Sequence, residues 1–129
     1  MFSGCEGLTS SDVTNFNTKN VQNFSGMFQF LRQLKSLYVS NFVTSKGTDF
    51  SYMFQNCYYL TSIDLSSFDT SKSTDFYYMF SQCMSVTSLD VNKFVTSNVR
   101  DMYGIFYGCS QSIVLDLTSF QTSAVKDMA

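Results

Sequence analysis

The sequence predicts an α/β repeat solenoid, a coiled chain with one short strand and one short helical segment in each 26-residue copy. Self-similarity at a fixed period is the signature of such folds, and here it continues without insertion or deletion. The pair Met27-Phe28 returns at the same point of every copy, as Met1-Phe2, Met53-Phe54, Met79-Phe80 and Ile105-Phe106. Two more columns never vary: the phenylalanines Phe16, Phe42, Phe68, Phe94 and Phe120, and the threonines Thr18, Thr44, Thr70, Thr96 and Thr122.

The repeats divide the chain into five copies, at residues 1–26, 27–52, 53–78, 79–104 and 105–129. One copy cannot bury its own apolar face, whereas stacked copies share a core, so we predict a single repeat domain over residues 1–129. The chain starts at the Met-Phe pair of one copy and stops inside another, so both ends of the core are expected to be uncapped. Open ends favour a fragment or engineered piece of a longer array, or head-to-tail association with other chains.

An alternating apolar pattern predicts the strand of each copy. The second copy reads Leu-x-x-Leu-x-Val-x-x-Phe from Leu34 to Phe42, and its centre alternates as a strand does. The next two copies repeat the pattern, with Leu60, Ile63, Leu65 and Phe68 and with Val86, Leu89, Val91 and Phe94. The last copy departs from it at Ser112, where we expect a local shift of register.

Steps of three and four residues predict the helical segment. They place one apolar stripe along a short helix or chain of helical turns, which in residues 21–34 contains Val21, Phe24, Met27, Phe28, Leu31 and Leu34. The invariant threonine, with Asp or Asn five residues on, offers acceptors for the unpaired N–H groups where that segment begins. Each copy is thus expected to run strand, turn, helical segment, turn.

Composition weighs against several classes of function. The net charge is −2 and no basic face is visible, so no nucleic-acid partner is predicted. No apolar run approaches the ~18 to 20 residues that span a bilayer, so no membrane insertion is expected. The chain contains no histidine, and no nucleophile–base pair, phosphate loop or metal cluster is visible. The sequence therefore predicts no enzyme, no cofactor and no metal site.

The copies resemble the repeat of a known family. The string Met-Phe-x-x-Cys-x-x-Leu-x-Ser-Leu/Ile-Asp-Leu/Val-Ser/Asn-x-Phe-x-Thr-Ser is similar to the bacterial surface protein type of leucine-rich repeat, the BspA-like family. The resemblance covers the whole chain and implies a leucine-rich-repeat-type right-handed coil. It also implies an extracellular or cell-surface protein associated with adhesion and with binding host or partner proteins, although the opening Met-Phe-Ser-Gly is not that of a signal peptide.

Four cysteines occupy one column of the repeat, Cys5, Cys57, Cys83 and Cys109, whose fifth member is Leu31. A position that accepts leucine is apolar, so buried free thiols are expected. Neighbouring helical segments ~8 to 10 Å apart would hold these residues too far apart for disulfides. Zinc would lack a fourth nearby ligand.

An acidic column on the strand face consists of Asp12, Asp64, Asp90 and Asp116, and Tyr38 interrupts it. These carboxylates could gather cations or basic partner groups, or they could bond to the turns beside them. Turn bonding is the expected role, because a calcium site needs about six to eight converging oxygens rather than a line of carboxylates.

The tyrosines are the candidates for partner binding. Tyr38 falls on the strand face, and seven others fall on the helical segment away from its apolar stripe: Tyr52, Tyr58, Tyr59, Tyr77, Tyr78, Tyr103 and Tyr107. All are expected to be exposed, and those of adjacent copies to form one patch. Exposed tyrosine is enriched in binding surfaces, although it can also pack between neighbouring coils.

These observations predict a non-catalytic protein-binding or adhesion module whose partner is a protein or a component of a host surface. The alternative is a structural or self-assembling repeat scaffold without a specific ligand. Binding that depends on the tyrosines would favour the first function, and concentration-dependent filament formation would favour the second.

Overall fold

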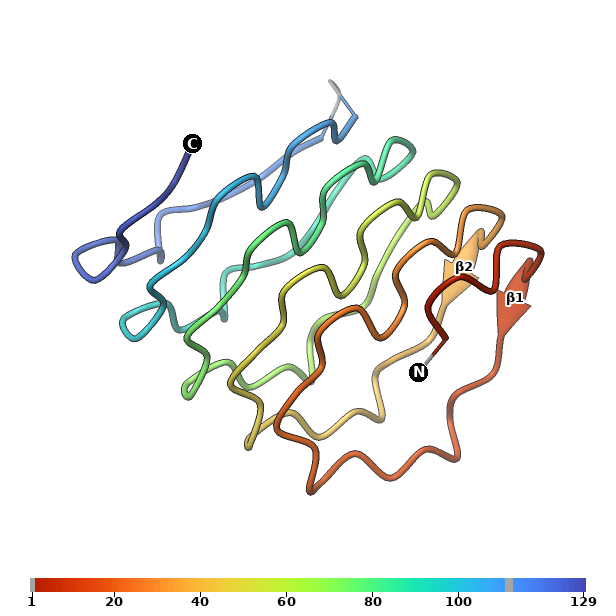
Figure 1. Cartoon of the computed structure of the whole chain (residues 1–129), viewed down its shortest axis with the longest axis horizontal. Coiled ribbons are helices and arrows are strands. Elements are labelled where there is room, and N and C mark those ends of the chain that lie inside the picture. The colour runs from red at the N-terminus through yellow and green to blue at the C-terminus, as the bar shows by residue number, and fades with distance from the viewer. Residues whose placement is uncertain (1, 111–112) are drawn as a thin grey trace.

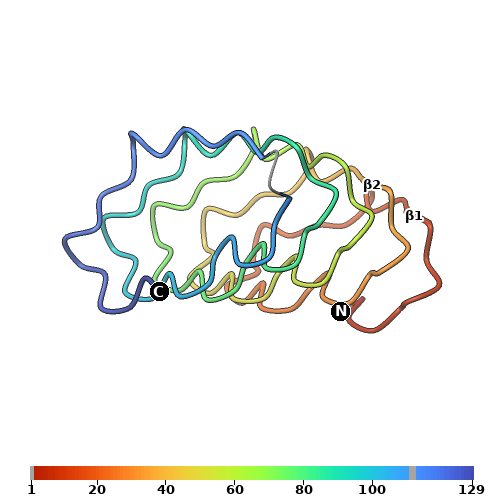
Figure 2. The same cartoon turned by 90° about the horizontal axis from the view of Figure 1, so that it is seen from above.

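The computed structural model describes residues 2–110 and 113–129, and the chain in it forms a stack of coils (Figure 1). The stack runs from the N-terminal coil at the right of Figure 1 to the C-terminal coil at the left, and Figure 2 shows it from above. Each coil is one 26-residue copy. Residues in the same column of the repeat therefore lie next to each other in adjacent coils.

Two short parallel strands mark one side of the stack. Strand β1 (Ser10–Ser11) pairs with strand β2 (Ser36–Leu37), with Ser10 opposite Ser36. Single bridges continue this side at Leu37–Ile63 and Ser88–Val114. A second line of parallel bridges joins the following residues on another side: Asn23–Asp49, Asp49–Asp75, Asp75–Asp101 and Asp101–Asp127.

No helix is present in the described residues, and this differs from the helical segment expected in each copy. Residues 24–31, 50–57, 76–83 and 102–109 instead form rows of turns, which we call the turn rows. In the first row the N–H groups of Phe24, Gly26, Phe28 and Phe30 donate to the next coil, at Asp49, Ser51, Met53 and Gln55, over 2.8–3.0 Å. The N–H groups of Met27 and Gln29 donate three residues back within the row. A helix would need N–H groups to donate four residues back throughout.

The physical reason is visible in the backbone conformation. Two columns of the turn rows have positive φ: the first is Gly26, Tyr52, Tyr78 and Gly104, and the second is Phe30, Asn56, Gln82 and Gly108. A left-handed residue every fourth position turns the chain so that alternate N–H groups face the neighbouring coil. The apolar residues then recur at steps of three and one, which resembles helical spacing.

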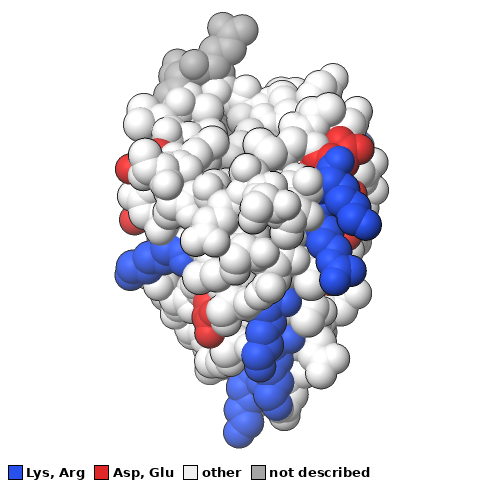
Figure 3. All heavy atoms as spheres, turned by 90° about the vertical axis from the view of Figure 1, so that its left-hand side faces the viewer, with Lys and Arg blue, Asp and Glu red and all other residues white. Residues whose placement is uncertain are grey.

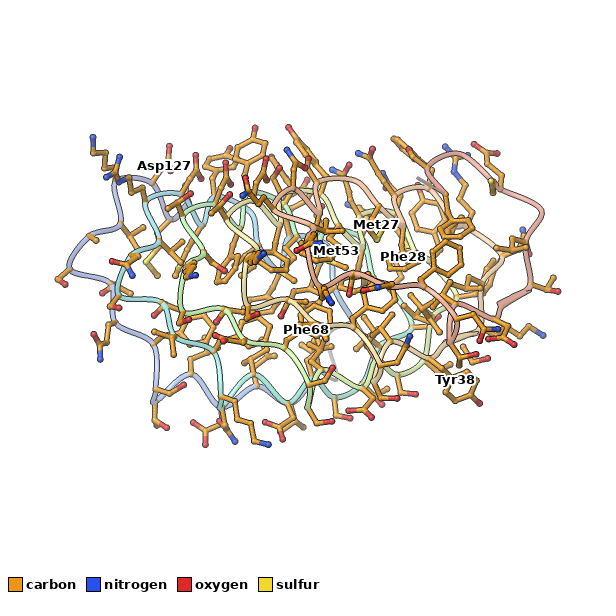
Figure 4. All side chains as sticks on the ribbon, turned by 90° about the horizontal axis from the view of Figure 1, so that it is seen from below. Met27, Phe28, Tyr38, Met53, Phe68 and Asp127 are labelled. Atoms are coloured by element: carbon orange, nitrogen blue, oxygen red, sulfur yellow. The ribbon has the colours of Figure 1, made fainter. Side chains whose placement is uncertain are left out.

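A ladder of stacked phenylalanine rings fills the centre of the stack. Successive members have ring centroids 5.5–5.8 Å apart and planes within 10° of parallel; they are Phe2, Phe28, Phe54, Phe80 and Phe106. Phe28, Phe54 and Phe80 have no exposed surface. Figure 4 shows the same interior with Met27, Phe28, Met53 and Phe68 pointing inward. At about 1.5–3 kcal/mol per buried side chain, this core dominates the stability of the fold.

The invariant threonines join neighbouring coils at one corner. The Thr44 hydroxyl donates to the Asp69 carbonyl at 3.0 Å and accepts the Asp69 N–H at 2.8 Å. Thr18, Thr70 and Thr96 bond in the same two-way manner to Val43, Val95 and Gln121. The expectation that these hydroxyls cap a helix is therefore wrong, because each completes the backbone pairing between two coils.

The last copy shows a local shift of the hydrogen-bonding pattern. Ser112, where the shift was expected, lies outside the described residues. Next to it, the Val114 N–H donates to the Thr87 carbonyl, whereas the Thr61 N–H donates to the Lys35 carbonyl in the same column as itself. The Val114 bond is thus out of step with the repeat by a single position. The regular pattern returns at Phe120, whose N–H donates three residues back to Leu117.

Candidate protein-binding surface

Five tyrosines from adjacent coils gather on the turn rows, and we call them the tyrosine cluster: Tyr52, Tyr77, Tyr78, Tyr103 and Tyr107. Tyr77 is the centre of the first contacts, with ring centroids 5.1 Å from Tyr52, 4.6 Å from Tyr78 and 5.7 Å from Tyr103. Tyr78 adds contacts to Tyr52, Tyr103 and Tyr107 at 5.4–6.2 Å. The rings thus form one continuous aromatic surface that no single repeat could supply.

Backbone conformation lets these rings interlock. Tyr52 and Tyr78 have φ values of +57° and +52°, a conformation that non-glycine residues adopt at a cost of about 1–3 kcal/mol. Gly104 continues the same column with φ +59°. A Cβ atom on Gly104 would lie 2.6 Å from Cε1 of Tyr78. Glycine is therefore required there both by the left-handed backbone and by the Tyr78 ring that lies against it.

The structure corrects the expectation that all eight tyrosines are exposed. Tyr52, Tyr77, Tyr78 and Tyr103 are half-buried because they cover one another, and Tyr107 at the end of the cluster is exposed. The cluster therefore combines mutual packing with a partly open outer face. The tyrosine rings of this cluster therefore pack between neighbouring coils and still leave part of their surface open to a partner.

The other three tyrosines make no ring contact with the cluster. Tyr58 is half-buried, with the Arg32 guanidinium carbon 5.7 Å from its ring centroid. Tyr59 and Tyr38 are 52% and 64% exposed. Figure 4 places Tyr38 at the opposite edge of the molecule from Asp127, which continues the column beside the cluster. The predicted patch of adjacent copies thus keeps Tyr52, Tyr77, Tyr78 and Tyr103, and Tyr58 and Tyr59 fall outside it.

A row of carboxylates runs beside the tyrosine cluster, and its proximity to the tyrosines was not foreseen from the sequence. We call it the acidic row; it consists of Asp49, Asp75, Asp101 and Asp127, and parallel bridges join each member to the next one in the row. Asp75 Oδ1 accepts the Tyr77 N–H at 2.8 Å, and Asp101 Oδ1 accepts the Tyr103 N–H at 2.9 Å. These bonds hold the Asp75 and Asp101 carboxylates beside the backbone of a cluster tyrosine two residues later in the chain. The fixed offset between Asp and Tyr in the repeat was the available sequence signal.

Burial and neighbouring charge set the ionisation of this surface. Partial burial raises the pKa of Asp75, and the nearby Asp49 and Asp101 raise it further. The pKa values of Tyr77 and Tyr78 are also raised, first by desolvation and then by neighbouring tyrosines. The phenol groups therefore stay neutral hydrogen-bond donors and acceptors at physiological pH.

Replacing Asp75 with asparagine is expected to stabilise the fold at neutral pH by roughly 0.2–1 kcal/mol, the usual cost of like charges opposite each other. Asparagine keeps an acceptor for the Tyr77 N–H, and Asn23 already occupies this column. The folded-state pKa of Asp75 is raised, so the contribution of its carboxyl group to the free energy of unfolding is full below the unfolded-state pKa. That contribution is lost as pH rises through the folded-state pKa. The gain should therefore vanish below about pH 3. Urea unfolding at both pH values measures it.

Asp64 provides the matched control for that substitution. The Ser66 hydroxyl and N–H hold the pKa of Asp64 below its ordinary value, so its contribution is present above the unfolded pKa and is lost as pH falls through the folded pKa. Asp64→Asn should consequently destabilise the fold at neutral pH. A loss of stability in both variants would refute the assigned repulsion at Asp75.

The strand-face acidic column bonds to turns, as expected. Asp12 Oδ1 accepts the N–H and hydroxyl of Thr14 at 3.0 and 2.6 Å. Asp64, Asp90 and Asp116 likewise accept the N–H two residues on, over 3.0–3.1 Å. Bonds to the side chain and backbone of Thr14 and Thr118 lower the pKa values of Asp12 and Asp116.

The cysteine column is only partly buried. Cys57 and Cys83 are buried, Cys109 is half-buried and Cys5 is exposed, which corrects the expectation of four buried thiols. The Sγ atoms of Cys57, Cys83 and Cys109 donate to carbonyls of the preceding coil, at Phe28, Phe54 and Phe80, over 3.1–3.2 Å. Desolvation raises the pKa of Cys57 to about 12 and that of Cys109 to about 11.

Within residues 2–110 and 113–129, no group of three or more Cys, Asp or Glu side chains is arranged to hold a metal ion. Over the same residues, no helix has the length and apolar character required to cross a membrane.

A protein-family model matches most of the chain. It is described as "Mycoplasma protein of unknown function, DUF285" and matches residues 1–113, which cover the first four copies and the start of the fifth. No curated protein matches the chain, and no solved structure matches it.

Proposed function

The chain belongs to the DUF285 family, and on that premise we propose that it is a non-catalytic protein-binding or adhesion module of a cell-surface protein. The finer relationship we propose is to BspA-like leucine-rich repeats. Two motifs of that resemblance have structural counterparts here, because the Cys thiols and the invariant Thr hydroxyls both bond neighbouring coils. This relationship makes the stack a leucine-rich-repeat-type solenoid in which turn rows take the place of helical segments.

The tyrosine cluster is the single observation that carries the binding function. Five rings from adjacent coils make one surface, and four of them are fixed by mutual contact before any partner arrives. Rigid tyrosines supply large contact area at a low cost in side-chain entropy, and their hydroxyls supply hydrogen bonds. A surface that is organised in advance loses little free energy when a partner binds.

The acidic row supports a partner with basic side chains. Asp75 and Asp101 lie two residues before Tyr77 and Tyr103, so carboxylates and aromatic faces alternate along the coils. A lysine or arginine is attracted by both groups, by the carboxylate through charge and by the ring through a cation–π contact of about 0.5–2 kcal/mol. The proposed partner segment is therefore basic and extends across two or more coils.

Panning a random-peptide phage library on the immobilised chain tests this function. The enriched peptides are expected to carry Lys or Arg and to bind the chain less tightly as salt is raised. Replacing Tyr77 and Tyr103 together with alanine should weaken binding at least about tenfold, because truncated aromatic hot spots cost roughly 2 kcal/mol or more.

A double variant, Tyr38→Ala with Tyr59→Ala, is the matched control, since these two rings are more exposed but lie outside the cluster. It should bind the peptides as the original chain does. Thermal unfolding of both variants separates lost binding from lost folding. Equal binding by the two variants, or a library that yields no enriched peptide, would contradict the proposal.

A further inference from the structure

Two pairs of rings in the tyrosine cluster meet at their edges across neighbouring coils. The ring centroids of Tyr52 and Tyr77 are 5.1 Å apart with planes at 75°, and those of Tyr78 and Tyr103 are 5.4 Å apart with planes at 65°. The first pair connects the second copy of the repeat to the third, and the second pair connects the third copy to the fourth. Each pair is therefore a contact between coils and not within one coil.

The backbone holds the same residues together. The Tyr52 N–H donates to the Tyr77 carbonyl at 2.8 Å, and the Tyr78 N–H donates to the Tyr103 carbonyl at 2.9 Å. The two members of each pair are thus fixed at the main chain as well as at the ring. Reacting groups that the fold holds in contact need no diffusional encounter to react with each other.

The hydroxyl groups within each pair also lie close together. The Tyr77 hydroxyl interacts with that of Tyr52, and the Tyr78 hydroxyl with that of Tyr103; after desolvation, these interactions help to raise the pKa values of Tyr77 and Tyr78. In a phenol, the two ortho carbons are bonded to the carbon that carries the hydroxyl. Contact between two hydroxyls therefore brings ortho carbons of the two rings near each other.

The remaining close pairs are less suited to a bond between rings. The rings of Tyr52 and Tyr78 and those of Tyr77 and Tyr103 are stacked, with planes at 8° and 21°. Stacked rings present their faces to each other, whereas a bond between ortho carbons lies in the plane of both rings. Tyr77 and Tyr78 meet edge to face at 4.6 Å, but they are consecutive residues of one coil, so a bond between them would join no coils.

We propose that Tyr52 with Tyr77, and Tyr78 with Tyr103, are sites of oxidative cross-linking, at which a haem peroxidase and hydrogen peroxide join the two rings as dityrosine. Each phenol gives up one electron and one proton and becomes a phenoxyl radical. The two radicals couple through their ortho carbons, and the hydrogens on those carbons move as protons to the phenol oxygens, which restores both rings. One hydrogen peroxide is reduced to two waters for each link. This modification does not require the binding function.

The links would add covalent bonds between coils. Cys5, Cys57, Cys83 and Cys109 are free thiols, so among the described residues no disulfide joins one coil to another. Hydrogen bonds and packing alone hold the described coils side by side. A dityrosine link closes a loop of about one repeat, and such a closure stabilises a fold by restricting the unfolded chain.

The surface does not favour a charged oxidant. The net charge of the chain is −2, and the face shown in Figure 3 carries Lys and Arg side chains as well as Asp and Glu side chains along its edges. A surface with charges of both signs has no strong field that would concentrate a charged molecule. Hydrogen peroxide is small and neutral. The four paired rings are half-buried, so part of each remains open to the peroxidase reaction.

Peroxidase treatment of the whole chain tests the proposal. Accessible thiols are first alkylated under native conditions, and hydrogen peroxide is then added in an amount equal to that of the chain. The monomer fraction should gain dityrosine fluorescence and lose two hydrogens in mass. Tryptic digestion should then join residues 47–72 to 73–93, and 73–93 to 101–126. Dityrosine that forms only between chains, or none at all, would overturn the proposal.

Phenylalanine variants identify the reacting rings, because phenylalanine keeps the ring and lacks the phenol. Tyr52→Phe with Tyr103→Phe should lower the yield of both linked peptides at least about tenfold, since the positioned partners are gone. Tyr58→Phe with Tyr59→Phe is the matched control, because these tyrosines share the 47–72 peptide with Tyr52 but lie outside the cluster. It should leave the yield unchanged. An equal loss in both variants, or no loss in the first, would overturn the assignment.

Thermal unfolding of the linked monomer shows whether the native geometry accommodates the bond. Its melting temperature should rise by at least about 5 °C, because the unfolded chain is restricted. The Tyr52→Phe and Tyr103→Phe double variant, treated in the same way, controls for other oxidation and should show no such rise. An unchanged or lower melting temperature in the linked chain would mean that the bond distorts the coils, and would overturn the proposed pairing.

Discussion

Replacing Phe54 with alanine lowers the free energy of unfolding by about 3–5 kcal/mol, the range for a fully buried aromatic side chain. Phe54 has no exposed surface, and its ring stacks on Phe28 at 5.7 Å and on Phe80 at 5.5 Å. The Phe54 side chain fills space between two neighbouring coils, and its removal would leave a cavity there. A coil that moved to close this cavity would lose its own stacking contacts in the phenylalanine ladder. Urea unfolding followed by circular dichroism measures the loss.

Phe106 supplies the comparison within the same column. Its ring stacks on Phe80 at 5.8 Å but borders an open cavity on the other side. Phe106→Ala should therefore cost less, on the order of 1–2 kcal/mol. Equal losses for the two substitutions would mean that stacking between coils is not what stabilises the core.

Replacing Thr70 with valine costs about 2–6 kcal/mol, although valine has nearly the same shape. The Thr70 hydroxyl donates to the Val95 carbonyl at 3.2 Å and accepts the Val95 N–H at 2.8 Å, and Thr70 is 1% exposed. Valine leaves both Val95 backbone groups without partners, at about 1–3 kcal/mol each. The loss is measured by urea unfolding.

Thr70→Ser is the matched variant, because it keeps the hydroxyl and removes only one methyl group. It should cost about 1 kcal/mol. If serine proves as damaging as valine, the methyl group and its packing explain the invariant column, and the hydrogen bonds between coils do not.

The sequence was sufficient to identify the columns and much of the core. Phe28, Phe54 and Phe80, together with Cys57 and Cys83, are buried at the positions that the repeat predicted. Column comparison succeeds here because every internal copy has the same neighbours on both sides. It fails at the ends, where Cys5 and Phe16 occupy core columns but are exposed.

The turn rows could not be distinguished from helices by apolar spacing alone. Inward residues at steps of three and one satisfy both descriptions, as Phe24, Met27 and Phe28 do. The distinguishing signal was glycine at positions of positive φ, such as Gly26 and Gly104, but Tyr52 and Tyr78 occupy the same column and obscure it.

The tyrosine cluster was identified by residue type but not by membership. Sequence spacing placed Tyr58 and Tyr59 beside Tyr77 and Tyr78, because a helical row was expected to bring them together. Tyr58 instead follows the end of a turn row and lies against Arg32. From the sequence, the aspartates of the acidic row were expected only to accept N–H groups at the start of a helical segment. Their position beside Tyr77 depends on a turn that a helical segment would not contain.

The coil-to-coil ladder of the turn rows is the claim on which both proposals depend, and NMR couplings across hydrogen bonds test it directly. The Phe54 amide nitrogen should couple to the Met79 carbonyl carbon in the next coil, because that N–H donates there at 2.9 Å. Coupling of Phe54 to Phe50, four residues earlier, would mean a helix. In a helix the tyrosines of adjacent coils would not be brought into contact by hydrogen bonds between the coils, so that result would contradict the proposed binding surface.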